Sequence, residues 1–327
     1  MNAFQSPAST VAVGMMAPKD KYEKLSGMNS FSSSTISVFT PMLAASISSI
    51  FGLNGVLFID MMSFGVAFLA LLFFIIIPEQ GKNTNQKQKQ SGVLGGALDG
   101  ALEGFAFLRK QKGLLYLVFS MAIMNFFSRL TYENILPAML LSRSGNNQNI
   151  LGFVSGMIGF GGILGGVFVT LIKVPKNKIK VIYFAAAFTF LGGDLLMGLG
   201  RNALIWSFAA LAASIPIPFI NAGQSVLLYS NIPTIMQGRV FAVRNGLQFL
   251  TIPIGVLLGG ALADYVFEPY MKQSTAFVSF LQKFVGTGEG NGMAVMFLCT
   301  GIIGFIISLI WYKNKHIQAL QAKAIQN

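Results

Sequence analysis

Charged residues, cysteine and histidine are scarce in this sequence. Only 10% of its 327 residues are charged, and it contains one cysteine and one histidine. A lone Cys299 excludes a disulfide within the chain. Because the single histidine, His316, lies in the C-terminal tail, no cluster of histidine and cysteine is present to hold a catalytic metal. These absences argue against an enzyme, and no cofactor is expected.

Long apolar runs are abundant instead. Hydrophobic residues make up 54% of the chain, and about 20 consecutive apolar residues are enough to cross a bilayer. Eight segments approach or exceed this length, which predicts an all-α fold, a polytopic bundle of transmembrane helices. The segments are residues 31–51, 54–77, 114–141, 150–172, 181–199, 203–230, 247–267 and 292–312.

Basic residues gather on one side of the predicted bundle. They occur in alternate connections, at 19–24, 82–112, 173–180, 239–244 and 313–323. The opposite side receives only Arg143, Arg201, Lys272 and Lys283. Because short cytoplasmic loops collect Lys and Arg, the sequence predicts a multi-pass plasma-membrane protein with a cytoplasmic C-terminus. Topology and anionic lipid then account for the net charge of +12, and no nucleic-acid partner is expected.

An internal repeat indicates two related halves. Residues 2–31 align without gaps with 221–250, and both stretches contain a helix end, a loop and the start of the next helix. We therefore expect 113–327 to be a C-terminal six-helix bundle and 1–77 to be the remainder of an N-terminal bundle. Residues 78–112 form a cytoplasmic linker with an amphipathic helix. This organisation predicts an N-terminally truncated chain with about 8 complete spans of an expected 12; the alternative is a genuine eight-span protein.

The second half carries several motifs in a recognisable order. They are NNQNILGFVSGMIGFGGILGG at 146–166, Pro218–Asn221, QGRVFAVR at 237–244, PIGVLLGGALADYVFEPYM at 253–271 and GTGEGNGMA at 286–294. These stretches resemble the major facilitator superfamily and, within it, the macrolide-efflux branch. The resemblance implies a secondary active transporter that exports macrolide-like or other amphipathic drugs in exchange for protons. Its partners would be the lipid bilayer, a small amphipathic substrate and protons.

Two other functions remain open from the sequence. The chain could be a transport-inactive truncated membrane fragment, or it could import a small metabolite. The segment 222–229 differs from the more polar segment that the macrolide-efflux branch usually has at this place, so the resemblance does not fix the substrate.

Few ionisable side chains lie inside the predicted spans, where each needs a partner or a purpose. Arg129 and Glu133 are four residues apart and share a helix face. They are candidates for proton coupling, and a structural ion pair is the alternative. Asp60 is a further proton-coupling candidate unless it lies close enough to the surface to stay hydrated. Asp194, near an outer helix end, is expected to be structural or solvated.

Uncharged polar residues provide the candidates for a substrate cavity. Asn125, Asn221 and Gln224 lie within or near spans. They could bind substrate or, as the favoured alternative, join neighbouring helices by hydrogen bonds. Arg239 and Arg244 are placed in the cytoplasmic loop before residue 247. They are candidates for a cytoplasmic gate, and anchoring by the positive-inside rule is the alternative.

Glycines spaced four residues apart predict close approach between helices. The pairs are Gly152 with Gly156, Gly161 with Gly165, Gly162 with Gly166, and Gly255 with Gly259.

Overall fold

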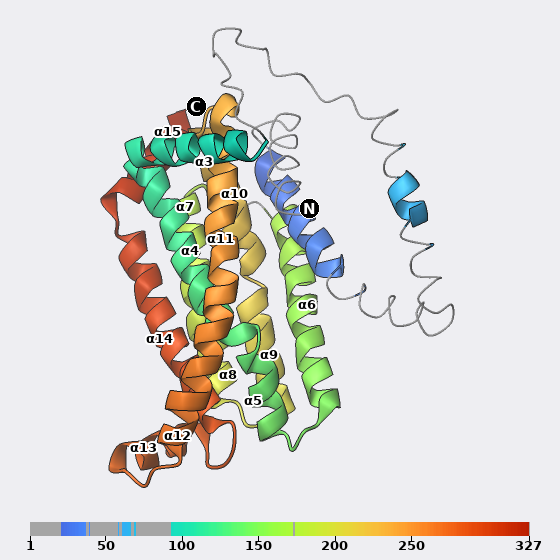
Figure 1. The fold of residues 1–327 in the computed structure, drawn as a ribbon, viewed down its shortest axis with the longest axis vertical. Coiled ribbons are helices and arrows are strands. Elements are labelled where there is room, and N and C mark those ends of the chain that lie inside the picture. The colour runs from blue at the N-terminus through green and yellow to red at the C-terminus, as the bar shows by residue number, and fades with distance from the viewer. Residues whose placement is uncertain are drawn as a thin grey trace.

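A computed structural model describes residues 21–36, 39, 58, 61–66, 69, 93–172 and 174–326. Within these residues every regular element is a helix. Most of the helices run side by side as a bundle, and α3 (Val93–Lys110) lies across the end that also carries the C-terminus (Figure 1). The all-α bundle predicted from the apolar runs is confirmed.

The other helices follow one another along the chain with short connections. They are α4 (Lys112–Tyr132), α5 (Ile135–Arg143), α6 (Gln148–Leu171), α7 (Lys178–Phe188), η2 (Thr189–Asp194), α8 (Leu195–Leu199), α9 (Ala203–Ser214), α10 (Ile217–Asn231), α11 (Thr234–Leu262), η3 (Ala263–Phe267), α12 (Glu268–Met271), α13 (Ala276–Val285), α14 (Asn291–Tyr312) and α15 (Lys315–Gln326). The elements η2 and η3 are π-helical turns that continue the helices before them.

Six stretches of the described residues are long and apolar enough to span a membrane. They are Lys112–Arg143, Gln148–Leu171, Lys178–Leu199, Ala203–Asn231, Thr234–Met271 and Asn291–Tyr312. These stretches correspond to the last six of the eight predicted spans. The first two predictions, 31–51 and 54–77, lie mainly outside the described residues.

The start of the fifth of these spans was predicted wrongly. Residues 239–244 were placed in a cytoplasmic loop, whereas α11 begins at Thr234 and includes both Arg239 and Arg244. The physical reason is that charge does not break a helix, since arginine is a good helix former. Proline, which does interrupt helices, first occurs within α11 at Pro253. The two arginines therefore project from a helix that extends beyond the apolar run.

The span Lys112–Arg143 is interrupted near its middle, which the sequence analysis did not predict. Here α4 ends at Tyr132, α5 begins at Ile135, and Glu133 and Asn134 form the break. Pro137 explains the position, because it has no backbone N–H to donate to the carbonyl of Glu133 and its ring crowds that carbonyl. The break puts an ionisable side chain where the helix is irregular.

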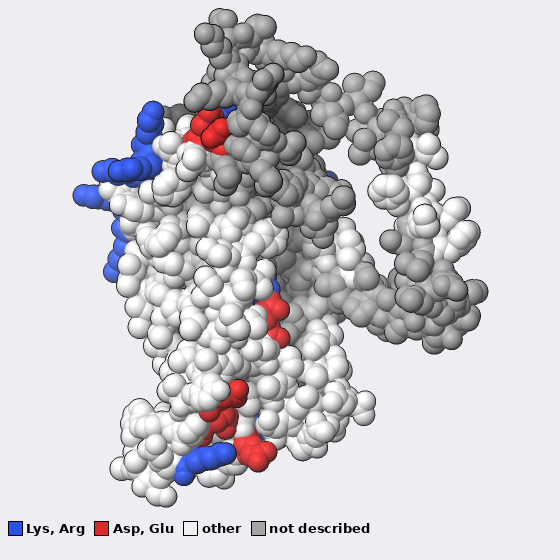
Figure 2. Space-filling view, viewed as in Figure 1, with Lys and Arg blue, Asp and Glu red and all other residues white. Residues whose placement is uncertain are grey.

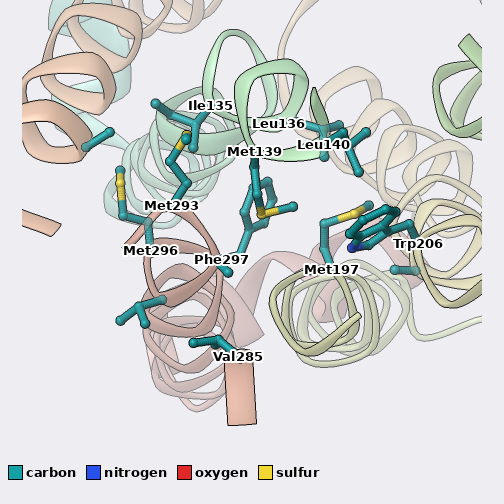
Figure 3. Packing of buried hydrophobic residues seen from close by; sticks show 14 of the residues in the cluster. Ile135, Leu136, Met139, Leu140, Met197, Trp206, Val285, Met293, Met296 and Phe297 are labelled. Carbon is teal, nitrogen blue, oxygen red and sulfur yellow. The ribbon is translucent and has the colours of Figure 1, made fainter. Parts of the chain in front are cut away.

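Three apolar clusters are buried among the described residues, and the two larger ones join most of the spans. One contains Met139, Met197, Trp206 and Phe297, and Figure 3 shows Met139 beside the Phe297 ring and Met197 beside Trp206. The other cluster joins α3, α7, α10, α11 and α15 to the first part of α4. Each of these two clusters contains residues from several spans, so apolar packing joins the spans to one another in both parts of the bundle.

Most of the predicted glycine contacts are present. A Cβ on Gly165 would lie 2.3 Å from the carbonyl oxygen of Ile215, and one on Gly259 would lie 2.3 Å from that of Leu130. These separations are too short for any side chain, so glycine allows α6 to approach the junction of α9 and α10, and α11 to approach α4. Gly152 and Gly156 differ, because nothing lies within 4 Å of a Cβ at either position.

Residues 21–36 of the first half form a helix that packs along α6. A Cβ on Gly166 would lie 2.7 Å from the backbone nitrogen of Phe31, and one on Gly162 would lie 2.3 Å from the Ser34 hydroxyl oxygen. The Gly162 and Gly166 pair therefore makes a surface on which the first half of the chain contacts the second.

Helix α3 lies within residues 78–112, the stretch predicted to be a cytoplasmic linker. It docks on α11 through Gly104, where a Cβ would lie 2.5 Å from the carbonyl oxygen of Arg239, and through Leu108, which is fully buried. Two apolar residues of α3, Leu102 and Phe105, are 66% and 47% exposed. The docked face of α3 therefore leaves these two apolar side chains exposed.

Candidate functional site: polar residues along the spans

The break in the span Lys112–Arg143 carries the candidate proton-coupling pair. Arg129 lies in the last turn of α4, and its guanidinium forms an ion pair with the carboxylate of Glu133. Both side chains remain more than a third exposed, at 36% and 37%. The pair is therefore not buried in the core of the bundle. Each charge is balanced by a residue of the same span rather than by one on another helix.

Helix α11 approaches this pair closely. A Cβ on Gly255 would lie 2.8 Å from the Cβ of Arg129, so glycine is needed for the contact. One turn earlier on α4, Asn125 donates hydrogen bonds to the Thr251 hydroxyl at 2.6 Å and to the Gln248 carbonyl at 3.2 Å. Asn125 therefore joins α4 to α11, which is the role that the sequence favoured over substrate binding.

Asn134 provides a second polar link at the break. Its side-chain nitrogen donates to the Val256 carbonyl of α11 at 3.2 Å, and its side-chain oxygen is buried with no hydrogen-bond partner among the described residues. The sequence analysis did not single out Asn134. Pro137, three residues later, was the signal that could have marked it.

Gln224 and Arg244 form a polar contact between α10 and α11. The Arg244 guanidinium donates to the side-chain oxygen of Gln224 at 3.0 Å, and Gln224 is buried. Asn221, one turn before Gln224 on α10, is half-buried. The structure thus brings a cavity candidate together with a gate candidate, which the sequence analysis had treated separately.

The end of the bundle near the C-terminus carries two further ion pairs. Arg239 pairs with Glu103 of the linker helix α3. Lys178, at the start of α7, pairs with Glu23 of the first half and donates to the carbonyls of Val174 and Pro175. Sequence reasoning counted Lys178 only as a topology marker, because nothing in the sequence shows that Glu23 lies beside it.

Aromatic and hydroxyl contacts extend this junction between the halves. The Tyr22 and Tyr229 rings stack with their centroids 4.6 Å apart, and the Ser225 hydroxyl lies 3.4 Å from that of Ser26. Burial raises the pKa of the Tyr22 hydroxyl above its ordinary value. Residues 21–36 are therefore held against α6, α7 and α10 by packing, stacking and an ion pair.

Asp194 is fully buried at the end of η2. The Tyr132 hydroxyl donates to one of its carboxylate oxygens at 3.0 Å, and the Thr300 hydroxyl donates to the other at 2.9 Å. The expected structural role agrees with this geometry, whereas the alternative of a solvated carboxylate does not. The reason is tertiary, since α4 and α14 cover the residue on two sides.

Charged side chains are unevenly distributed over the surface. On the face shown in Figure 2, blue Lys and Arg gather at the end that carries α3, and the long middle section is almost entirely uncharged. This is the pattern of a protein whose middle lies in lipid. Among the described residues no group of three or more His, Cys, Asp or Glu could hold a metal ion. Asp60 lies outside the described residues.

Comparisons with known proteins agree with the motifs. Macrolide efflux protein A from Streptococcus pyogenes is 24% identical over 272 residues, which cover 81% of this chain and 64% of that protein. Its Enterococcus faecalis namesake is 24% identical over 262 residues, or 78% of this chain and 76% of that protein. The uncharacterized MFS-type transporter YkuC from Bacillus subtilis (strain 168) is 25% identical over 267 residues, or 78% and 60%.

The chain spans less than two thirds of the length of the first of these relatives. No solved structure is significantly similar to it. The family model of the Major Facilitator Superfamily matches residues 1–256, which is more than half of the chain. The resemblance seen in the motifs is therefore confirmed, and this multi-pass, all-helical membrane protein belongs to the major facilitator superfamily.

Proposed function

We propose that the protein exports an amphipathic, macrolide-like compound in exchange for protons. The observation that carries this proposal is the Arg129 and Glu133 pair, which lies half-exposed at a helix break within an apolar span. Two of the relatives are named as macrolide efflux proteins, which supports the substrate class.

Glu133 would act as the proton-binding group. An isolated carboxylate is costly inside a membrane, and Arg129 offsets that cost while Glu133 is ionised. When Glu133 takes up a proton, its side chain becomes neutral and Arg129 loses its anionic partner. Proton binding therefore changes the charge balance at the point where α4 and α5 meet, and the break allows the two helical segments to respond separately.

The neighbouring polar groups would orient the substrate. Asn125 donates hydrogen bonds to Thr251 and Gln248 of α11, so it would hold α4 and α11 together along the proposed substrate pathway. Asn221 and Gln224 are cavity candidates on α10, and Arg239 and Arg244 are gate candidates toward the end of the bundle predicted to be cytoplasmic. In this scheme the Gln224 and Arg244 contact couples cavity and gate.

The test is proton-driven drug transport in membrane vesicles with an imposed pH gradient. Glu133→Gln should abolish macrolide-dependent proton movement, because the amide cannot take up a proton, while exchange of labelled macrolide across the membrane continues. Glu289→Gln is the matched control, since Glu289 lies exposed in the connection before α14. Unchanged proton movement in Glu133→Gln would contradict the role of Glu133, and no macrolide movement by the unaltered chain would contradict the function.

A further inference from the structure

The helix α13 lies outside the spans, at the end of the bundle opposite the C-terminus (Figure 1). It begins after Thr275, whose hydroxyl accepts a hydrogen bond from the backbone N–H of Val278 at 3.3 Å. It ends at Gly286, whose φ of 93° is a conformation that favours glycine. The sequence analysis placed these residues in a loop, although both end signals are visible in the sequence.

One face of α13 is docked on the bundle. Val278 and Val285 are fully buried in the cluster that contains Trp206 and Phe297, and Leu281 packs against the same cluster. Gln282 on this side donates to the Met271 carbonyl at 3.3 Å. The helix is therefore seated by apolar contacts with a hydrogen bond beside them.

Two arginines from other elements hold the C-terminal end of α13. Arg201 donates to the carbonyls of Lys283 at 2.7 Å and Phe284 at 3.1 Å. Arg143 donates to the carbonyls of Val285 and, at 3.1 Å, Gly198. Cations suit the negative end of a helix dipole. These contacts fix the rotation of α13, and they give a structural purpose to two of the few basic residues on this side.

The outward face of α13 consists of phenylalanine. Phe277, Phe280 and Phe284 recur at spacings of three and four residues, and they are 58%, 52% and 48% exposed. Their rings contact one another along the helix, with centroids 6.5 Å and 5.2 Å apart. A third face carries the exposed polar residues Ser279 and Lys283. The helix thus presents separate protein-facing, apolar and polar sides.

Exposed aromatic residues also occur in the elements that precede α13 in the chain. Tyr265 of η3 is 83% exposed and Tyr270 of α12 is 37% exposed. Further along the same span Leu257 is 73% exposed, as expected of a side chain that faces lipid. Aromatic residues are enriched where a membrane protein crosses from hydrocarbon to water. Helix α13 follows the span that ends at Met271 and precedes the span that begins at Asn291, with short connections on both sides, so it lies at the membrane edge.

We infer that α13 is an interfacial helix whose phenylalanine face lies in the boundary between lipid head groups and acyl chains. An amphipathic helix with aromatic residues on one side and Lys on the other adopts this position. The occupant of the apolar face is lipid, because α13 connects the ends of two spans at the membrane edge and the contacts of Arg143 and Arg201 fix the face outward from the protein. The inference does not depend on the transported substrate.

Spin labels at single cysteines test this placement in the full chain. In a Cys299→Ala background, Phe280→Cys is labelled, reconstituted into phosphatidylcholine and phosphatidylglycerol vesicles, and measured for collisions with oxygen and with a water-soluble nickel chelate. The label at 280 should meet oxygen more often and nickel severalfold less often than the label at Ser279→Cys, one residue earlier on the polar face. Leu257→Cys gives the reference for a lipid-facing position, and Phe284→Cys repeats the measurement if Phe280→Cys does not fold.

Two results would overturn the inference. Equal nickel accessibility at 279 and 280 would mean that the phenylalanine face is in water. Low accessibility to both reagents, or broadening of the spectrum that disappears when labelled protein is diluted with unlabelled protein, would mean that protein or a second copy covers the face instead.

Discussion

Glu133 and Asp194 are two carboxylates in one helical bundle with opposite surroundings. Glu133 pairs with Arg129 of its own span, and its side chain stays 37% exposed. Asp194 is completely buried, and it accepts hydrogen bonds from Tyr132 on α4 and Thr300 on α14. One carboxylate is satisfied locally by a cation, and the other is satisfied by hydroxyl groups from two other spans.

This difference separates two ways of tolerating an acidic residue in a membrane. A local i, i+4 partner lies on the same span, so a change in the charge of the residue breaks no ion pair with another helix. Partners on several spans make the residue a structural link, because removing it takes an acceptor away from the hydroxyls on those spans. We therefore expect changes at Asp194 to affect stability and changes at Glu133 to affect transport.

The largest loss of stability is expected for Asp194→Ala. It removes the acceptor of the Tyr132 hydroxyl, leaves Thr300 with only the Phe297 carbonyl and creates a void, so the free energy of unfolding should fall by about 2 to 3 kcal/mol. Denaturation in lipid and detergent micelles would measure it. Asp194→Asn, which keeps the size and an acceptor oxygen, should lose less than half as much. If Glu133→Ala destabilises the protein as strongly as Asp194→Ala, the distinction fails.

A smaller effect is expected where α14 packs against η2, beside Asp194. A Cβ on Gly304 would lie 2.3 Å from the Phe190 ring. Gly304→Ala should therefore force the helices apart and cost about 1 to 2 kcal/mol, measured by the same unfolding assay. Gly156→Ala is the matched control, because nothing lies within 4 Å of its Cβ, and it should be neutral or stabilising by up to about 1 kcal/mol. Equal effects at the two glycines would contradict the close packing.

Tyr132→Phe removes only the hydrogen bond from Tyr132 to Asp194. It keeps the ring, which packs edge-on against Phe297, and removes the hydroxyl donor. Hydrogen bonds between membrane helices contribute about 0.6 kcal/mol on average, so a loss of that size is expected. Combining it with Thr300→Val measures whether the two donors are coupled. Strict additivity would mean that Asp194 accepts from them independently.

The smallest change in stability is expected for Arg129→Ala. An exposed i, i+4 ion pair contributes about 0.3 to 0.5 kcal/mol, and Glu133 can take up a proton once its cation is gone, so unfolding should hardly change. Proton-driven transport should nevertheless fall, since Glu133 loses the cation that offsets its charge. A large loss of stability with normal transport would show that the pair is structural and that the roles of the two carboxylates are exchanged.

The spans could be predicted from the sequence because lipid imposes a simple requirement of apolar length. Five of the six described spans begin and end within a few residues of the prediction. The start of α11 was missed because Arg239 and Arg244 were taken as marks of a loop, although a helix can extend past the apolar core. The break at Glu133 was missed because the continuous apolar run outweighed Pro137.

The candidate site was predictable only where both partners lie close together in the chain. Arg129 and Glu133 are four residues apart, and their contact follows from helix geometry. The Gln224 and Arg244 contact joins two helices, and the Lys178 and Glu23 pair joins the two halves of the chain. No local pattern specifies such contacts, because they depend on how helices are rotated against one another.

The sequence by itself determined that this protein is a helical membrane bundle and which family it resembles, because apolar length and motifs are properties of the chain. Only the tertiary structure decided the environment of individual polar groups. Asp194 is buried because α4 and α14 meet over it, and the phenylalanine face of α13 points outward because Arg143 and Arg201 fix the helix. Burial and orientation are set by neighbours that are distant in sequence, and packing brings them together.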